Sequence, residues 1–286
     1  MHLIAPIAET RLKEVVDYFA HLGLKDQRAF GATAVKKAEL RRSLNQILDK
    51  EVLDANIGLG ILATYENNLD KALEHFKIAY NFSNKDSTSS LNYANSLFVS
   101  GRHKEAFPIY KNAIIKEPTS LDIFQGICRA LIGYGYLDEL EDISKCLKGI
   151  ESPYSARYQR EINLMRNTLS YLESINVSVD LFRSYHIAID KIFFKYFNIT
   201  TTFDTEVFHD RDRSTFSYLI YLPVSKSDKN IEDLVGDMND ELQDEIIKLR
   251  KTDDVENKEI IREMSKKLCF YFSLPRCLDV EGGNGC

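Results

Sequence analysis

The chain has 286 residues, of which 44% are hydrophobic and 28% are charged, a balance typical of globular proteins with one large domain or two ordinary ones. There is no run of 18 apolar residues and no signal-like start, so the sequence predicts neither a membrane span nor secretion. The net charge of −6 arises within residues 178–286, because residues 1–177 carry equal numbers of acidic and basic side chains. This acidic excess argues against a nucleic-acid groove in the second part of the chain, since such grooves are basic.

The cysteines are odd in number and form no C-x-x-C pair. In a chain without a signal segment, this usage predicts free thiols in a reducing compartment. We therefore expect a cytoplasmic protein, and the sequence calls for no cofactor. The five cysteines are Cys128, Cys146, Cys269, Cys277 and Cys286.

Two stretches in the first half of the chain place the same residue types at the same spacing. Small and aromatic residues of the range 59–84 recur 34 positions later in the range 93–118, and a weaker third set follows. A period of this length is typical of stacked helical repeats, in which each unit is one pair of helices. The matched positions are Leu59–Gly60 with Tyr93–Ala94 and Ile127–Cys128, Ala72 with Ala106 and Leu140, Phe76 with Tyr110 and Ser144, Ala79 with Ala113 and Leu147, and Asn84 with Pro118.

The middle copy shows most clearly where its helices begin and end. We predict a first helix over Ser89–Ser100, a turn at Gly101 where glycine frees the backbone, and a second helix over Lys104–Lys116. This second helix ends before Pro118, because the residue that precedes a proline resists the α conformation. One such pair cannot cover its own apolar face, so the repeats must stack on one another.

This pattern resembles the tetratricopeptide (TPR) repeat over about residues 53–150, in copies at 53–86, 87–120 and 121–152. Ala38 hints at an earlier, divergent copy, and a helix over Tyr154–Ile175 is suited to cap the stack. The resemblance implies a mainly α fold, in which residues 1–177 form a TPR-like α-solenoid of helical hairpins.

The resemblance also implies a groove, lined by the first helix of each unit, that binds a partner peptide or protein. Asn95 matches one position of the TPR subclass that clamps C-terminal carboxylates, but Leu91 and Gly126 do not, so that clamp is absent. The alternative role for every groove position is ordinary packing between helices. The implied partner-binding residues are Ile57, Ile61, Tyr65, Leu91, Asn95, Phe98, Gln125, Arg129 and Ile132.

Residues 178–286 differ in pattern and predict a small α+β domain with a β-hairpin and an acidic helix. The range 228–263 contains 13 acidic and 6 basic residues, which form either a solvated helical face or a surface that meets a basic partner. The second strand is apolar on both faces and therefore central or covered. The expected elements are a helix over Val179–Phe197, strands over 201–210 and 214–224, helices over Ser227–Leu249 and Val255–Lys267, and a strand over 269–275.

Candidate catalytic residues gather around the predicted hairpin. Asp204 and Glu206 share one face of a strand, where two hard oxygen ligands can hold Mg²⁺ or Mn²⁺. However, no lysine follows Glu206 at the spacing of metal nucleases, and His209 lies at a hairpin tip, where polar residues serve turns. His186 and Asp190 form a second candidate pair, one helical turn apart. We assign no catalytic or metal-binding residue.

A basic cluster precedes the repeats, at Lys36, Lys37, Arg41 and Arg42. It falls on one helix and lacks the interleaved aromatic residues of nucleic-acid-binding surfaces. We interpret it as a solvated helical face.

The first functional hypothesis is therefore an intracellular protein-interaction module, acting as an adaptor, a regulator or an antitoxin-type or immunity-type protein. The alternative is a TPR-regulated enzyme or effector, with a metal-dependent hydrolase or nuclease site in the α+β domain. A third hypothesis is a transcriptional regulator that binds a small peptide in the groove. The sequence leaves the partner and the oligomeric state open.

Overall fold

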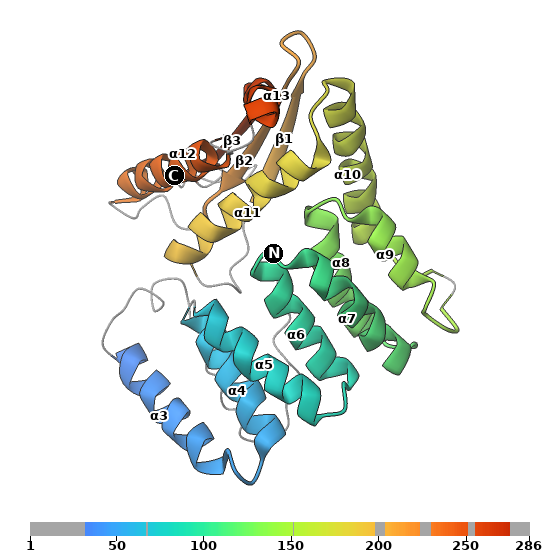
Figure 1. Ribbon diagram of the computed structural model, residues 1–286, viewed down its shortest axis with the longest axis vertical. Helices are drawn as coiled ribbons and strands as arrows, with labels where there is room; N and C mark the ends of the chain where they lie inside the picture. The colour runs from blue at the N-terminus through green and yellow to red at the C-terminus, as the bar shows by residue number, and fades with distance from the viewer. Residues whose placement is uncertain are drawn as a thin grey trace, which may run out of the picture. The chain divides into compact units, whose positions relative to one another are not determined.

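The structure is a computed structural model that describes residues 32–66, 68–150, 152–197, 204–223, 230–250 and 255–274. These residues are mainly helical, with a small three-stranded sheet near the C-terminus (Figure 1). Among them, no helix is both long enough and apolar enough to cross a membrane. The elements are α3 (Ala32–Ile47), α4 (Val52–Tyr65), α5 (Leu69–Phe82), α6 (Ser87–Val99), α7 (His103–Lys116), α8 (Leu121–Gly133), α9 (Leu137–Ser144), α10 (Ala156–Ser174), α11 (Val179–Tyr196), β1 (Asp204–Asp210), β2 (Thr215–Tyr221), α12 (Ile231–Arg250), α13 (Val255–Ser265) and β3 (Leu268–Ser273).

The helices from α4 to α9 recur at the predicted interval. The second helices α5, α7 and α9 begin 34 residues apart, and the first helices α4, α6 and α8 also end 34 residues apart. Gly101 and Gly135 occupy equivalent turns, with φ of 76° and 69°, a conformation that glycine adopts without steric cost. The 34-residue period therefore describes the helices themselves as well as the residue pattern.

Small residues bring the two helices together in the first and second pairs. In the first pair, an added Cβ at Gly60 of α4 would lie 2.7 Å from the ring of Phe76 on α5, so only glycine allows this approach. In the second pair, Ala94 and Ala106 are both fully buried, and Tyr110 is completely covered. Helix α5 also packs on α6, and α7 packs on α8, so that consecutive pairs contact one another.

Side-chain caps fix several helix starts. The side chains of Asn68, Asp86 and Ser120 accept hydrogen bonds from backbone N–H groups three residues later. Because Asp86 is the cap, α6 begins at Ser87, two residues earlier than the sequence pattern predicted. The third pair is shorter, since α9 spans only Leu137–Ser144, and α10 packs on α8 beyond it.

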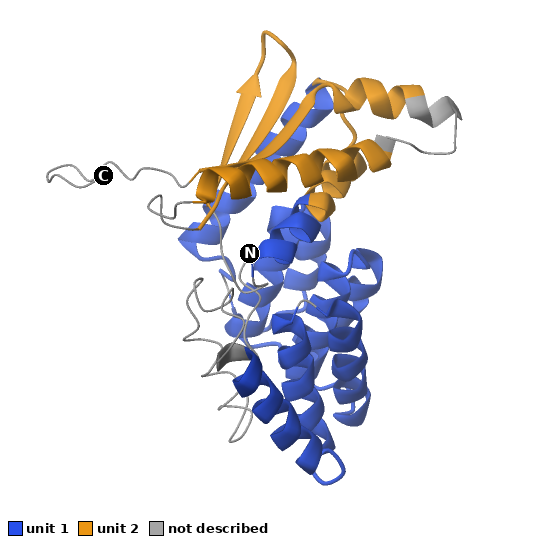
Figure 2. Cartoon of the chain, turned by 90° about the vertical axis from the view of Figure 1, so that its left-hand side faces the viewer, with its two compact units in different colours: residues 1–174, 189–201 blue, residues 175–188, 202–286 orange. Residues whose placement is uncertain are grey.

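The chain divides into two compact units (Figure 2). Unit 1 contains residues 1–174 and 189–201, and unit 2 contains residues 175–188 and 202–286. The sequence placed a single boundary after residue 177. The division into units falls at three places, after residues 174, 188 and 201, because the first part of α11 belongs to unit 2 and its remainder to unit 1.

Unit 2 contains a sheet with the strand order β1-β2-β3. The predicted hairpin is present, β2 is the central strand as expected, and β3 runs parallel to β2 after a crossover through α12 and α13. Phe182 and Tyr185 of α11 pack against Phe216 of β2 and Phe270 of β3, which forms an aromatic core. The outer parts of the predicted strands, residues 201–203, 224 and 275, lie outside the described residues.

Candidate functional site

The nine predicted groove residues separate into two groups. Six of them are buried among the helices: Ile57 and Ile61 on α4, Leu91, Asn95 and Phe98 on α6, and Ile132 on α8. Tyr65, Gln125 and Arg129 keep part of their surface accessible. Only these three present side-chain surface to a partner without a rearrangement of the described structure.

Phe98 lies inside an aromatic cluster formed by the turn within the second pair and the turn within the third pair. Its ring stacks on His103, with centroids 4.1 Å apart, and meets Tyr134 edge-on at 5.1 Å. His103 Nδ1 is 2.8 Å from the hydroxyl of Tyr136, at hydrogen-bond distance. With an exposed fraction of 1%, Phe98 holds neighbouring repeats together. The sequence signal for this role was the two tyrosines that flank Gly135.

Asn95, the single residue that matched the carboxylate clamp, is engaged inside unit 1. Its Oδ1 accepts a hydrogen bond of 2.8 Å from the hydroxyl of Tyr110 on α7. Burial raises the pKa of Tyr110 well above its ordinary value, so this hydroxyl remains a donor. Asn95 therefore supplies the hydrogen-bond acceptor for the buried hydroxyl of Tyr110.

Gln125 and Arg129 surround one tyrosine of α10. Arg129 Nε donates to the hydroxyl of Tyr158 at 2.9 Å, and that hydroxyl donates to the backbone oxygen of Gln125 at 3.4 Å. The side-chain amide of Gln125 takes no part in this bond. These contacts fix the position of α8 against α10, while both side chains remain partly exposed.

Helix α6 also carries a buried polar stripe that sequence reasoning did not single out. Ser89, Asn92 and Ser96 follow one another at helical spacing and are each at most 9% exposed. Ser96 donates its hydroxyl to the backbone oxygen of Asn92 at 3.0 Å. Within the described part of the chain, Asn92 Nδ2 has no hydrogen-bond partner.

His186 and Asp190 are both buried but have separate surroundings. The ring of His186 packs against Phe182 at 4.4 Å and Tyr218 at 4.7 Å, and burial lowers its pKa to about 3. Asp190 accepts a short hydrogen bond from the hydroxyl of Tyr134, and burial raises its pKa to about 6. Although they are one turn apart on α11, these side chains contact different partners.

The hairpin residues are also divided between two faces. Asp204 and Glu206 share one face as predicted, and Glu206 Oε2 accepts a 2.6 Å hydrogen bond from the hydroxyl of Tyr221. His209 lies on the other face beside Phe216, and burial together with Arg211 lowers its pKa. No group of three or more histidine, cysteine or acidic side chains able to hold a metal ion occurs in the described ranges.

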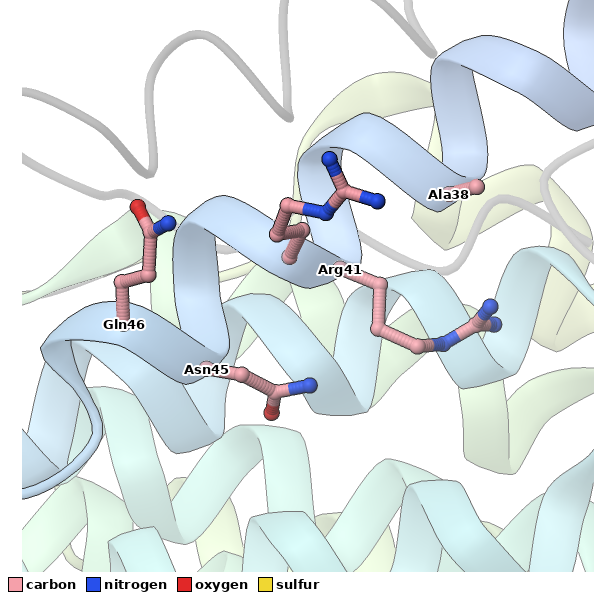
Figure 3. A pocket seen from close by; sticks show the side chains of 5 residues that line it. Ala38, Arg41, Asn45 and Gln46 are labelled. Atoms are coloured by element: carbon pink, nitrogen blue, oxygen red, sulfur yellow. The ribbon is translucent and has the colours of Figure 1, made fainter.

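One pocket lies along α3, with a volume of about 470 Å³ (Figure 3). Its described lining is a single face of the helix and combines guanidinium groups, which only donate hydrogen bonds, with amide groups, which both donate and accept them. Arg41 also forms an ion pair with Glu66, next to Tyr65 at the end of α4. The lining residues are Ala38, Arg41, Arg42, Asn45 and Gln46.

The described thiols are free, in agreement with the sequence prediction, and Cys277 and Cys286 lie outside the described residues. Burial raises the pKa of Cys128 to about 12, which leaves this thiol inert at neutral pH.

Comparison with known proteins found no matching family model, no matching curated protein and no matching solved structure.

Proposed function

We propose that this chain is a protein-interaction protein whose helix pairs from α4 to α9 form a TPR-like solenoid that binds a segment of a partner protein. The observation that carries the proposal is the 34-residue recurrence of helix boundaries. Repeats of this kind stack into extended surfaces, because each pair buries its apolar face only against its neighbours. Such surfaces commonly recognise peptides and helices of other proteins.

The partner contacts come from the first helices of the pairs. Tyr65 on α4 and Gln125 and Arg129 on α8 supply an aromatic ring, an amide and a guanidinium at partly exposed positions. Aromatic and arginine side chains contribute most of the energy in many interfaces. The buried predicted positions, with Phe98 at their centre, keep the helices that present these residues in place.

The pocket on α3 adds a chemical preference. Arg42 contributes a guanidinium, and Asn45 and Gln46 contribute amides, so the pocket favours an oxygen-bearing group of the partner. A carboxylate is the group that combines charge and acceptor geometry for this lining. The partner segment therefore carries an aspartate or glutamate where it reaches α3.

Site-specific photo-crosslinking in the full-length chain tests this proposal. A photoreactive amino acid replaces Tyr65 in one variant and Gln125 in another, and captured proteins are identified by mass spectrometry. Lys111, an exposed residue of the second helix α7, is the matched control position. We expect the same partner protein at both test positions and its absence at the control.

Two results would contradict the proposal. One is capture of the same protein with equal yield at all three positions, which indicates collision without a site. The other is the absence of any adduct at Tyr65 and Gln125 in cells where Lys111 forms one.

A further inference from the structure

The two faces of the sheet in unit 2 differ in burial. On the face that packs against α11, Phe216 and Ile220 of β2 and all three residues of β3 are buried. On the opposite face, named here the open sheet face, none of the eleven strand residues is buried. The open sheet face consists of Asp204, Glu206, Phe208 and Asp210 on β1, Thr215, Ser217, Leu219 and Tyr221 on β2, and Cys269, Tyr271 and Ser273 on β3.

The open sheet face combines apolar rings with carboxylates. Phe208 is 47% exposed and Tyr271 is 39% exposed, and both lie on this one face. Leu219 lies between them on the central strand and pairs with Tyr271. The carboxylates of β1 line the same face, and no lysine or arginine of the three strands occurs on it.

The contacts of α11 and α12 with the sheet lie away from the open sheet face. The contacts of α11 with the sheet run through Phe182 and Tyr185 to Phe216 and Phe270, which belong to the other face. Helix α12 lies along the outer edge of β3, where the amide of Asn239 bonds the backbone N–H and oxygen of Phe272 at 2.8 and 3.0 Å. Helices therefore protect one face and one edge.

The carboxylates and aromatic rings of the open sheet face indicate which kind of partner can bind to it. Cationic side chains, and arginine above all, stack on aromatic rings and also pair with carboxylates, so they match both components of this face. Helix α12 carries seven acidic and two basic residues, and its negative field attracts a basic segment to unit 2.

We propose that the open sheet face docks a basic, arginine-bearing peptide segment of a partner protein. Guanidinium groups lie over the rings of Phe208 and Tyr271 and bond to the carboxylates of Asp204 and Glu206. A symmetric association of two copies through this face is disfavoured, because it brings the three carboxylates of β1 toward those of the second copy. A nucleic acid is also disfavoured, because its phosphates would lie close to the same three carboxylates. This site is separate from the proposed partner site on the helical repeats.

Fluorescence anisotropy with the full-length chain measures the binding. The probe is a labelled peptide of alternating arginine and glycine, and the comparison peptide replaces each arginine with lysine. We expect saturable binding with a preference for the arginine peptide, and at least about a fivefold loss of affinity for the double variant Phe208→Ser and Tyr271→Ser. The control variant Ile247→Ser and Ile260→Ser removes two equally exposed apolar residues from α12 and α13 and retains full affinity.

Cys269 supplies a local readout, since it is exposed on the open sheet face in register with Phe208 through Ser217. Peptide mass spectrometry measures the alkylation rate of each cysteine. The arginine peptide should slow alkylation of Cys269 at least about threefold and leave the rate at Cys146 unchanged. Unequal protection of this kind places the ligand on the face itself.

Four outcomes overturn the proposal. They are no binding up to about 1 mM peptide, equal affinity for arginine and lysine peptides with no effect of the Phe208 and Tyr271 changes, unaltered alkylation of Cys269 at saturation, and self-association that the double variant abolishes. The last outcome assigns the face to a second copy. None of them affects the crosslinking test at Tyr65 and Gln125, so the two proposals fail independently.

Discussion

Replacing Gly60 by alanine should destabilise unit 1, because the added methyl group has no room. The new Cβ lies 2.7, 2.8 and 2.9 Å from three carbons of the Phe76 ring, and Phe76 is only 6% exposed and cannot swing into solvent. Overpacking of this kind costs about 1–3 kcal/mol. The better helix propensity of alanine returns about 0.5–1 kcal/mol. We expect a net loss of about 1 kcal/mol in the free energy of unfolding, within a range of about 0–2.5 kcal/mol.

Urea denaturation followed by far-ultraviolet circular dichroism measures this loss. Gly133→Ala is the control in the same unit, since no atom lies within 4 Å of its added Cβ, and it should be neutral or slightly stabilising. Gly60→Ala combined with Phe76→Leu should recover part of the loss. If Gly60→Ala is as stable as the wild type, or if Gly133→Ala loses as much, the close approach of α4 and α5 is not as described.

Two further predictions concern buried groups. Phe98→Ala should cost about 3–5 kcal/mol in unfolding free energy, because it empties the centre of the aromatic cluster; a thermal melt unchanged from the wild type would place Phe98 outside the core. Asp190→Asn should change how stability depends on pH. The pKa of Asp190 is raised from 3.8 to about 6 on folding, so its stabilising contribution is complete below about pH 4 and is lost as the pH rises through about 6. The gain of the variant over the wild type should therefore grow to at most about 3 kcal/mol at pH 7, and a pH-independent difference would refute the shift. The opposite pH dependence of buried His186 is present in both proteins and cancels in the difference.

The sequence predicted the helix period well because that period is a local property. Small residues must recur wherever two helices cross closely, and Ala72 and Ala106 are both almost fully buried at equivalent crossings. The start of α6 was placed two residues late, because Asp86 acts as a cap outside the apolar pattern.

The buried role of Phe98 depends on contacts that repeat alignment does not contain. An aromatic residue at a groove position gives the same sequence pattern whether its side chain faces a partner or a neighbouring turn. Here His103, Tyr134 and Tyr136 come from the following turns and enclose it. The different surroundings of His186 and Asp190 were hidden for the same reason, since one turn of helix separates them in sequence but their partners come from other elements.

The open sheet face could be reached only in part from the sequence. Alternation on β1 predicted that Asp204 and Glu206 share a face, and that expectation is met. The position of Tyr271 beside Leu219 requires that β3 run parallel to β2, and the sequence carried no signal for that pairing. The pairing of strands far apart in the chain could therefore not be predicted from the sequence.

The most direct test of partner binding by the helix pairs is an isothermal titration of the crosslinked partner against full-length protein. We predict that Tyr65→Ala together with Gln125→Ala weakens binding at least about tenfold, with an unchanged melting temperature. Lys111→Ala, on the second helix of the middle pair, should bind as the wild type does. Equal affinity of the wild type and both variants for that partner would contradict partner binding by the first helices of the pairs.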